Sequence, residues 1–202
     1  MLNGIKFPIV TLGPMGTDAS VIASSLSNEV IFKESFEQSM EYAHTHKLAA
    51  LICCGFVERK NGQIQDGWVD LNFRYMDKMK LTHAFHAKTK MMCVAKRKDC
   101  EEPKTIIIHP ATQTFANIYT PGLEVHYTNN KPSAVRLTAK GLYDMCIGSV
   151  DVIGQYECLE ILSTFQPSMV WAIYIHKNQE LEEVNEPVIK SRNHLYELSP
   201  IG

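Results

Sequence analysis

Residues 8–17 read PIVTLGPMGT: a short apolar run, a turn rich in glycine and proline, and a threonine. Residues 8–12 are typical of a buried strand in a parallel sheet. Thr17 or Asp18 can then cap a helix, because either side chain accepts a hydrogen bond from the first turn. The apolar positions that follow have the spacing of one helix face: Ala19, Ile22, Ala23 and Leu26. A buried strand that leads through a tight turn into an amphipathic helix predicts an α/β fold.

The same alternation continues along the chain in two series. We expect further strands at 29–33, 48–54, 105–109, 124–128, 145–148, 159–165 and 169–176. We expect helices from Ser35, near Asp66, at 112–119, from Pro132 and at 150–156. Residues 58–67 are expected as a polar turn, and residues 81–96 as one long extended stretch between two sheets. The pattern predicts mostly parallel sheets with helices on both faces, in two lobes with a cleft between them.

The length of 202 residues fits one or two domains. Because the long extended stretch can lead from one lobe to the other, we expect residues 1–84 and 167–178 in lobe 1 and residues 85–166 in lobe 2. Residues 179–202 would form a tail that is first acidic and then mixed in composition. The chain would therefore cross between the lobes twice.

Composition excludes several classes of protein. The longest apolar runs, 48–54 and 169–175, are far shorter than the about twenty residues that span a membrane. The net charge of −2 argues against binding to nucleic acid, because proteins that bind it carry a basic surface. Acidic residues directly follow the basic stretch 88–98, so that stretch is not expected to form such a surface. The first ten residues lack the apolar core of a secretion signal, and the six cysteines form no C-x-x-C pair. We expect a cytoplasmic protein without a membrane or nucleic-acid partner.

Three loops at expected strand ends carry candidate ligand-binding residues. In open α/β sheets, helix starts beyond the carboxyl ends of strands bind ligands through free backbone N–H groups. The loops are 13–17, with Gly16 and Thr17; 109–112, with His109 and Thr112; and 129–133, with Asn130, Lys131 and Ser133. Together they could hold a small anion such as a carboxylate. None has the spacing of a dinucleotide or phosphate-binding loop, so no cofactor is expected.

The histidine and cysteine residues are weaker candidates for a functional site. His83 and His86 lie three apart in an extended stretch and therefore point to opposite faces, which does not favour a metal site. Cys53 and Cys54 end an expected strand, where a nucleophile can stand, and packing as small buried residues is the alternative. No histidine is close in sequence to activate either thiol.

Three segments resemble the motifs of prephenate dehydratases, in the same order. TLGPMGT at 11–17 resembles the LGPEGT opening of that family, IIHPATQ at 107–113 its SHPQA segment, and NKPSAVR at 130–136 its STAEAA helix start. The resemblance spans about residues 9–177. It implies a two-lobed fold of the periplasmic-binding-protein type (type II), with substrate between the lobes and homodimerisation. We expect a catalytic unit without the regulatory ACT domain that usually follows in dehydratases.

Two differences from the dehydratase motifs argue against a dehydration reaction. Where a dehydratase carries a polar loop after its third strand, this chain has Ile52 to Phe56, ICCGF. Where a dehydratase carries the T-R-F motif, whose threonine is implicated in expelling the ring hydroxyl, this chain reads MVWA at 169–172. The short prephenate decarboxylases of bacilysin-type and aeruginosin-type pathways are similar in length, also lack T-R-F, and have a tryptophan in a segment that PSMVW at 167–171 resembles. GLYD at 141–144 is also similar to that branch.

This resemblance implies a lyase of antibiotic or specialised metabolism. It would release CO2 from prephenate, a dicarboxylate, without aromatising the ring. An apolar wall of Phe56, Val170 and Trp171 suits a poorly solvated ring carboxylate, and Thr17, Lys131 and Ser133 could hold the pyruvyl carboxylate. A histidine or a cysteine could donate the proton. The candidate catalytic residues are Trp171, Cys54 and His86. The candidate substrate-binding residues are Gly16, Thr17, Gly55, Phe56, His109, Thr112, Asn130, Lys131, Ser133 and Val170.

Two other hypotheses stay open at this point. One is a divergent dehydratase-like enzyme that acts on another small cyclic carboxylate, as in tropone-type pathways. The other is a non-catalytic cytoplasmic module that binds a small molecule, because the same two-lobed fold also binds solutes. Trp171 has a plain alternative as well, since a tryptophan on the last strand can simply pack in the core.

Overall fold

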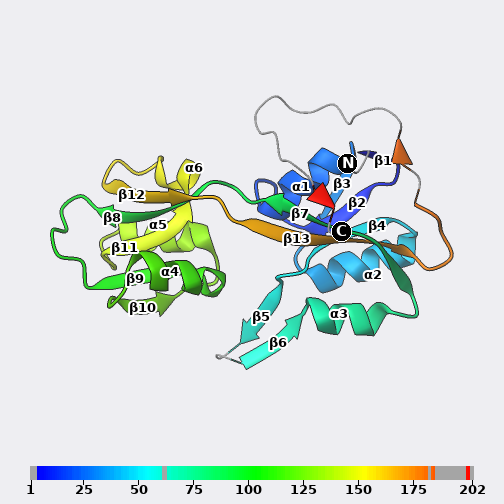
Figure 1. The fold of residues 1–202 in the computed structure, drawn as a ribbon, viewed down its shortest axis with the longest axis horizontal. Helices are drawn as coiled ribbons and strands as arrows, with labels where there is room; N and C mark the ends of the chain where they lie inside the picture. Colours follow the sequence, from blue (N-terminus) through cyan, green and yellow to red (C-terminus); the bar gives the residue numbers. More distant parts are fainter. Residues whose placement is uncertain (1–3, 61–62, 182, 185–198, 201–202) are drawn as a thin grey trace. The chain divides into compact units, whose positions relative to one another are not determined.

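A computed structural model describes residues 4–60, 63–181, 183–184 and 199–200. The chain divides into two compact units (Figure 1). Unit 1 comprises Met1–Thr89 and Ser168–Gly202, and unit 2 comprises Lys90–Pro167. The first crossing lies beyond the expected residue 84, because the strand that leads out of unit 1 continues to Lys88. Within the described residues, no helix is both long enough and apolar enough to cross a membrane.

The main sheet of unit 1 is mixed. Its order is β15 (Ser199–Pro200), β7 (Met79–Lys88), β13 (Ser168–His176), β4 (Ala49–Cys53), β2 (Ile9–Leu12) and β3 (Val30–Lys33). Strand β2 runs parallel to β3 and β4, whereas β13 runs antiparallel to β4 and β7. The expectation of mostly parallel pairing thus holds for only part of the sheet. The reason is that β7 leads the chain out of unit 1 and β13 brings it back.

Three helices accompany this sheet: α1 (Asp18–Leu26), α2 (Phe36–His46) and α3 (Trp68–Tyr75). The caps predicted for the first two are confirmed, since Thr17 accepts a hydrogen bond from the Ser20 N–H and Ser35 accepts one from the Gln38 N–H. All four apolar positions predicted for the face of α1 are buried. Every residue of β4 is buried as well, so both faces of the sheet are covered at its centre.

Three short pairings in unit 1 were not expected. Residues 58–67, expected as a polar turn, belong to a hairpin of β5 (Val57–Lys60) and β6 (Gln63–Gly67). No strand was predicted there because few apolar residues alternate with the polar ones. The expected tail also belongs to unit 1: β14 (Glu183–Val184) pairs with β1 (Gly4–Ile5), and β15 pairs with β7.

Unit 2 contains a second mixed sheet. Its order is β10 (Glu124–Tyr127), β9 (Thr105–Ile108), β11 (Met145–Ser149), β8 (Met92–Arg97) and β12 (Leu159–Phe165). Strand β9 runs parallel to β10 and β11, and β8 runs antiparallel to β11 and β12. The expected single stretch 81–96 is therefore two strands, β7 and β8, in different units.

Helices cover both faces of the sheet in unit 2. Helices α5 (Lys131–Ala139) and α6 (Val150–Ile153) pack through Ala134, Val135 and Ile153 against one face, and α4 (Gln113–Tyr119) packs through Ala116 against the other. A single 3-10 turn, η1 (Pro110–Thr112), precedes α4. Helix α6 is shorter than the expected 150–156. This alternation of strands and covering helices confirms the α/β class.

Candidate functional site

In unit 1, several candidate residues gather at one end of the sheet. The parallel strands β2, β3 and β4 all end there, and open α/β sheets bind ligands at such carboxyl ends. Strand β13 begins at the same end, because Trp171 pairs with Cys53 in the antiparallel register. Strand β7 ends there too, with His86 opposite Val170.

Five residues form what we call the strand-end region of unit 1: Cys54, Gly55, Phe56, Met169 and Val170. The Cys54 N–H donates to the Val170 carbonyl oxygen over 2.8 Å, which joins the two segments. A Cβ atom on Gly55 would lie 2.5 Å from the Met169 Cε, so glycine allows the methionine to approach. The Phe56 ring meets the Phe36 ring edge-on, with centroids 5.1 Å apart. The region is apolar and partly exposed.

Two ionisable groups, Cys54 in this region and Tyr174 beside it, stay neutral at neutral pH. Burial, with a smaller effect of Cys53, raises the pKa of the Cys54 thiol to about 12. Burial also raises the pKa of Tyr174 to about 12. The Tyr174 hydroxyl accepts a hydrogen bond from Trp68 Nε1 (2.9 Å) and donates one to Asn72 Oδ1 (3.0 Å). Cys54 is therefore a neutral thiol rather than a ready nucleophile, because the thiolate is the nucleophilic form.

Trp171 lies in the core rather than on the surface of this end. It is only 3% exposed and belongs to the main hydrophobic cluster of unit 1. Its indole Nε1–H is buried and has no hydrogen-bond partner among the described residues. His86, in contrast, is exposed. Trp171 can thus act on a ligand only through the residues that it supports.

The two tryptophans give a matched stability prediction. Trp171→Phe should leave the free energy of unfolding within about 1 kcal/mol of wild type, because the lost packing is offset by removal of an unsatisfied buried donor. Trp68→Phe should lower it by about 1–3 kcal/mol, because it leaves the Tyr174 hydroxyl without the Trp68 donor. Urea unfolding followed by circular dichroism measures both. If Trp171→Phe lowered the free energy of unfolding more than Trp68→Phe did, the conclusion that only the Trp68 indole N–H has a hydrogen-bond partner would be contradicted.

The loop 13–17 follows β2 at the same end of the sheet. Gly16 has a φ of +90°, a conformation that favours glycine, and its N–H donates to Ser20 Oγ (2.8 Å). The Thr17 hydroxyl accepts from the Ser20 N–H (3.2 Å) and donates to the Pro14 carbonyl (3.0 Å). The polar atoms of Thr17 thus stabilise the turn and the helix start.

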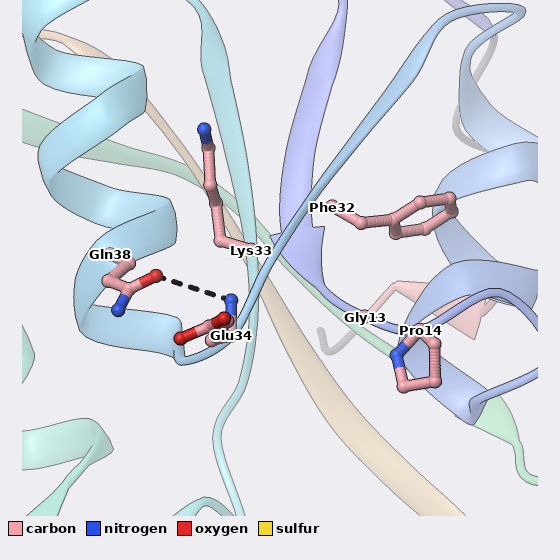
Figure 2. Close-up of a pocket in the computed structure, with 6 residues that line it drawn as sticks. All are labelled: Gly13, Pro14, Phe32, Lys33, Glu34 and Gln38. Atoms are coloured by element: carbon pink, nitrogen blue, oxygen red, sulfur yellow. Dashed lines mark hydrogen bonds between the residues drawn. The ribbon is translucent and has the colours of Figure 1, made fainter.

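An open pocket of about 630 Å³ borders this loop. Figure 2 shows its six lining residues, which come from the loop, from the end of β3 and from the start of α2: Gly13, Pro14, Phe32, Lys33, Glu34 and Gln38. None of the six was a candidate residue by sequence; Gly13 and Pro14 lie in the candidate loop 13–17, whereas Lys33, Glu34 and Gln38 lie outside every candidate loop. The available signal was their position, since a charged pair directly after a strand and before a helix cap lies at a carboxyl end of the sheet.

In unit 2, the structure brings the five remaining candidates together. His109 and Thr112 follow β9, and Asn130, Lys131 and Ser133 follow the parallel neighbour β10. Burial and the nearby Lys131 charge both lower the pKa of His109, so the imidazole is neutral at neutral pH. The arrangement places one cation and one neutral imidazole beside the start of α5, where backbone N–H groups favour anions.

His109 Nδ1 accepts a hydrogen bond from the Ala111 N–H (3.2 Å), and three other side chains of this group also hold the local structure. Asn130 Oδ1 accepts from the Ser133 N–H (2.8 Å), and Ser133 Oγ accepts from Arg136 Nη2 (3.0 Å). Thr112 is buried and donates its hydroxyl to the His109 carbonyl oxygen (2.8 Å). The described part of the chain contains no group of three or more His, Cys, Asp or Glu residues able to hold a metal ion.

Comparison with known proteins supports the fold. No protein-family model matches the sequence, and no curated protein matches it. Among solved structures, a prephenate dehydratase from Arthrobacter aurescens in complex with L-Phe is similar, with 13% identity and a TM-score of 0.56 over 88% of this chain and 62% of that one. A prephenate dehydratase from Staphylococcus aureus is similar with 11% identity and a TM-score of 0.52, over 85% of this chain and 68% of that one.

A periplasmic domain has the same fold. The BvgS periplasmic VFT2 domain of Bordetella pertussis matches with 13% identity and a TM-score of 0.50, over 86% of this chain and 81% of that one. The described α/β units and these similarities confirm the two-lobed, periplasmic-binding-protein-like (type II) fold. The chain spans 62% of the length of the Arthrobacter dehydratase. Proteins with this fold include prephenate dehydratases as well as periplasmic domains, so fold alone does not assign an activity.

Proposed function

We propose that this protein is a prephenate decarboxylase-like lyase that removes CO2 from prephenate without aromatising the ring, in antibiotic or other specialised metabolism. The observation that carries the proposal is the neutrality of the strand-end region. Cys54 in this region and Tyr174 beside it both have a pKa raised to about 12, and Phe56, Met169 and Val170 are apolar. Such surroundings suit a reaction in which a localised charge becomes dispersed.

The chemistry explains why such surroundings would help. The ring carboxylate loses its C–C bond and leaves as CO2, while the bonding electrons move through the diene and a ring carbon takes up a proton. A carboxylate has a concentrated charge that depends on solvation, whereas the charge of the transition state is spread over the ring. A weakly solvating wall therefore destabilises the ground state more than the transition state.

The positions of the dehydratase-like segments favour prephenate as the substrate. The first segment, 11–17, covers the end of β2 and the turn after it, and the second and third include the turns after β9 and β10. Lys131 at the start of α5 is the cation that we assign to the pyruvyl carboxylate, since charge-assisted hydrogen bonds are the strong ones. The Thr17 and Ser133 hydroxyls and backbone N–H groups already have partners within their own turns, so we assign neither residue to the carboxylate.

Incubation of the purified protein with prephenate tests the proposal. We expect CO2 release and a product whose proton NMR spectrum shows non-aromatic ring signals, with an enzyme-free sample as the control. Both dehydration and decarboxylation release CO2, so the ring signals decide between them. Phenylpyruvate as the product would identify a dehydratase and overturn the proposal. Unchanged prephenate would favour a binding module, for which the likeness to the Bordetella domain is the supporting observation.

A further inference from the structure

The main sheet of unit 1 has two edges, and they differ in how they are protected against pairing with another chain. One edge is β15, a strand of two residues that contains Pro200, whose nitrogen carries no hydrogen. The other edge is β3, which pairs with β2 on one side and with no described strand on the other. Proline and bulges commonly protect an edge, and β3 has neither. Strand β3 is therefore the edge to which another strand can be added.

Two residues of β3 direct their backbone N–H and C=O groups away from β2. The Glu29 and Lys33 carbonyl oxygens accept hydrogen bonds of 2.9 and 2.8 Å from N–H groups of β2 and of the turn after it. Because successive residues of a strand point these groups to opposite sides, the backbone groups of Val30 and Phe32 face the open side. These are the groups with which an added strand would form hydrogen bonds.

The side chains of β3 alternate between the two faces of the sheet. Figure 2 shows the Phe32 ring and the Lys33 ammonium on opposite sides of β3. By the same alternation, Val30 lies on the face of Phe32, whereas Glu29 and Ile31 lie on the face of Lys33. All four residues of β3 are half-buried, and Glu29 is exposed. An added strand would thus meet apolar side chains on one face and a charged residue at each end of the other.

The sequence of this edge is complementary to itself when two copies run antiparallel. If Ile31 lies opposite Ile31 of a second copy, Val30 lies opposite Phe32 and Glu29 opposite Lys33, each pair occurring twice. The outward-facing Val30 and Phe32 then exchange backbone hydrogen bonds, as the antiparallel pattern requires. Moving the register by two residues in either direction places Glu29 or Lys33 opposite Ile31. Only the register centred on Ile31 pairs both charges.

We propose that β3 pairs with β3 of a second copy of this chain, antiparallel about a two-fold axis at Ile31. The main sheets of the two copies would join into one, a known mode of strand addition. The charge complementarity of Glu29 and Lys33 argues for a second copy as the occupant of this edge. The sequence resemblance implies a homodimer but no surface, and this inference assigns the surface and the register from this chain's own residues.

The pocket of about 630 Å³ borders this surface within unit 1, since Lys33 and Glu34 are among its lining residues. In the proposed register, Glu29 and Asn28 of the second copy lie opposite these two residues and so beside the pocket. The ammonium of Lys33 lies 3.4 Å from the centre of the Tyr42 ring, a contact that leaves its N–H donors able to bind a carboxylate as well. The surface is independent of the proposed lyase activity.

Sedimentation equilibrium of full-length charge variants tests the pairing of Glu29 with Lys33. We expect the wild type to form dimers. Glu29→Lys and Lys33→Glu should each raise the dimer Kd at least about tenfold, because each replaces two attractive pairs by two repulsive ones. The double variant restores opposite charges and should return the Kd to within about threefold of wild type. Lys98→Glu, at an exposed position in unit 2, makes the same change in net charge as Lys33→Glu and is the matched control.

Circular dichroism establishes that each variant is folded. Wild-type protein that is monomeric at about 100 µM would overturn the proposal and would leave β3 open to an extended peptide of another protein. A dimer whose Kd is the same in wild type and in both single variants would be formed by another surface, which also overturns the proposal. The prephenate assay reports on the lyase activity separately.

Intermolecular disulfide formation by Ile31→Cys tests the register. Opposite residues of an antiparallel pair that is not hydrogen-bonded have Cα atoms about 4.5 Å apart, within the range of a disulfide. Oxidation with copper phenanthroline should therefore link two copies, which a non-reducing gel detects. Asn28→Cys is exposed, keeps both charges and is the matched control, because its two copies would lie about 20 Å apart along the strands. Wild type measures the background from its six cysteines. Equal linking of the two variants, or none by Ile31→Cys, would refute the register.

Discussion

Gly148→Ala should lower the free energy of unfolding by about 2–3 kcal/mol, because an added methyl group has no room there. Gly148 is buried in β11, opposite Cys93 of β8. Its new Cβ would overlap the Val135 Cγ2 and would lie 3.3 Å from the Ile153 Cδ1. Both contacts come from helices that cover this face, so α5 and α6 would have to move away from the sheet.

The Val135→Ala substitution provides the control, because it removes the overlapping methyl group. Alone it should destabilise the protein by about 1–3 kcal/mol. Added to Gly148→Ala, it should lower the free energy of unfolding little further. A double-mutant cycle should therefore give a coupling energy of about 2 kcal/mol. Far-UV circular dichroism in urea measures unfolding, and Trp68 and Trp171 fluorescence reports on unit 1 alone, since both tryptophans lie there. Additive effects would show that the overlap with Val135 is not the cause.

Local sequence patterns predict much of this fold. Strand β2, the Thr17 cap and the apolar face of α1 are local features, and the structure contains all three. The direction of β7 and β8 is not a local property, since it depends on which sheet each strand joins. Residues 81–96 therefore read as one extended stretch although they include a crossing between units. The need for glycine at position 148 is likewise hidden, because it arises from a helix packed thirteen residues earlier in the chain.

The position of the candidate site could be predicted from the sequence, but the hydrogen bonding and the burial of its residues could not. Loops after parallel strands were identifiable, and the structure places 13–17, 109–112 and 129–133 at such ends. Which polar atoms already have partners depends on the folded turns and on tertiary contacts. The Thr112 hydroxyl is bonded within its own turn and Trp171 is buried, and neither is visible in residue type, whereas the Thr17 cap was predicted. Lys33 and Glu34 were overlooked because only the folded turn at Gly13 places them beside a pocket.

Cys54→Asp should lower kcat/KM for prephenate by about 100-fold or more, if the strand-end region surrounds the departing carboxylate. The introduced carboxylate would repel the carboxylate of the substrate. The repulsion should be strong because the surroundings disfavour charge, as the pKa of about 12 for the Cys54 thiol indicates. Cys54→Asn has nearly the same shape without the charge and is the matched control. We expect it to keep activity within about tenfold of wild type. Steady-state kinetics of all three proteins at neutral pH gives the comparison.

Cys54→Ala separates this environmental role from nucleophilic catalysis. With a pKa of about 12, the thiol is almost fully protonated at pH 7, so its loss should change kcat/KM little and leave the pH profile between about pH 6 and 9 unaltered. Complete loss of turnover in Cys54→Ala would instead favour a covalent or proton-transfer role for the thiol.

The pH dependence of Cys54→Asp then tests the electrostatic explanation itself. The burial that disfavours the thiolate also disfavours a carboxylate, so the introduced group should have a pKa above the ordinary value of about 4. Below that pKa the group is neutral and the substrate meets no extra charge; above it the repulsion is complete. Activity should therefore recover as pH falls, towards the level of Cys54→Asn. A variant that is equally impaired at every pH would point to a change in shape rather than in charge, and would refute the neutral strand-end region as the basis of the reaction.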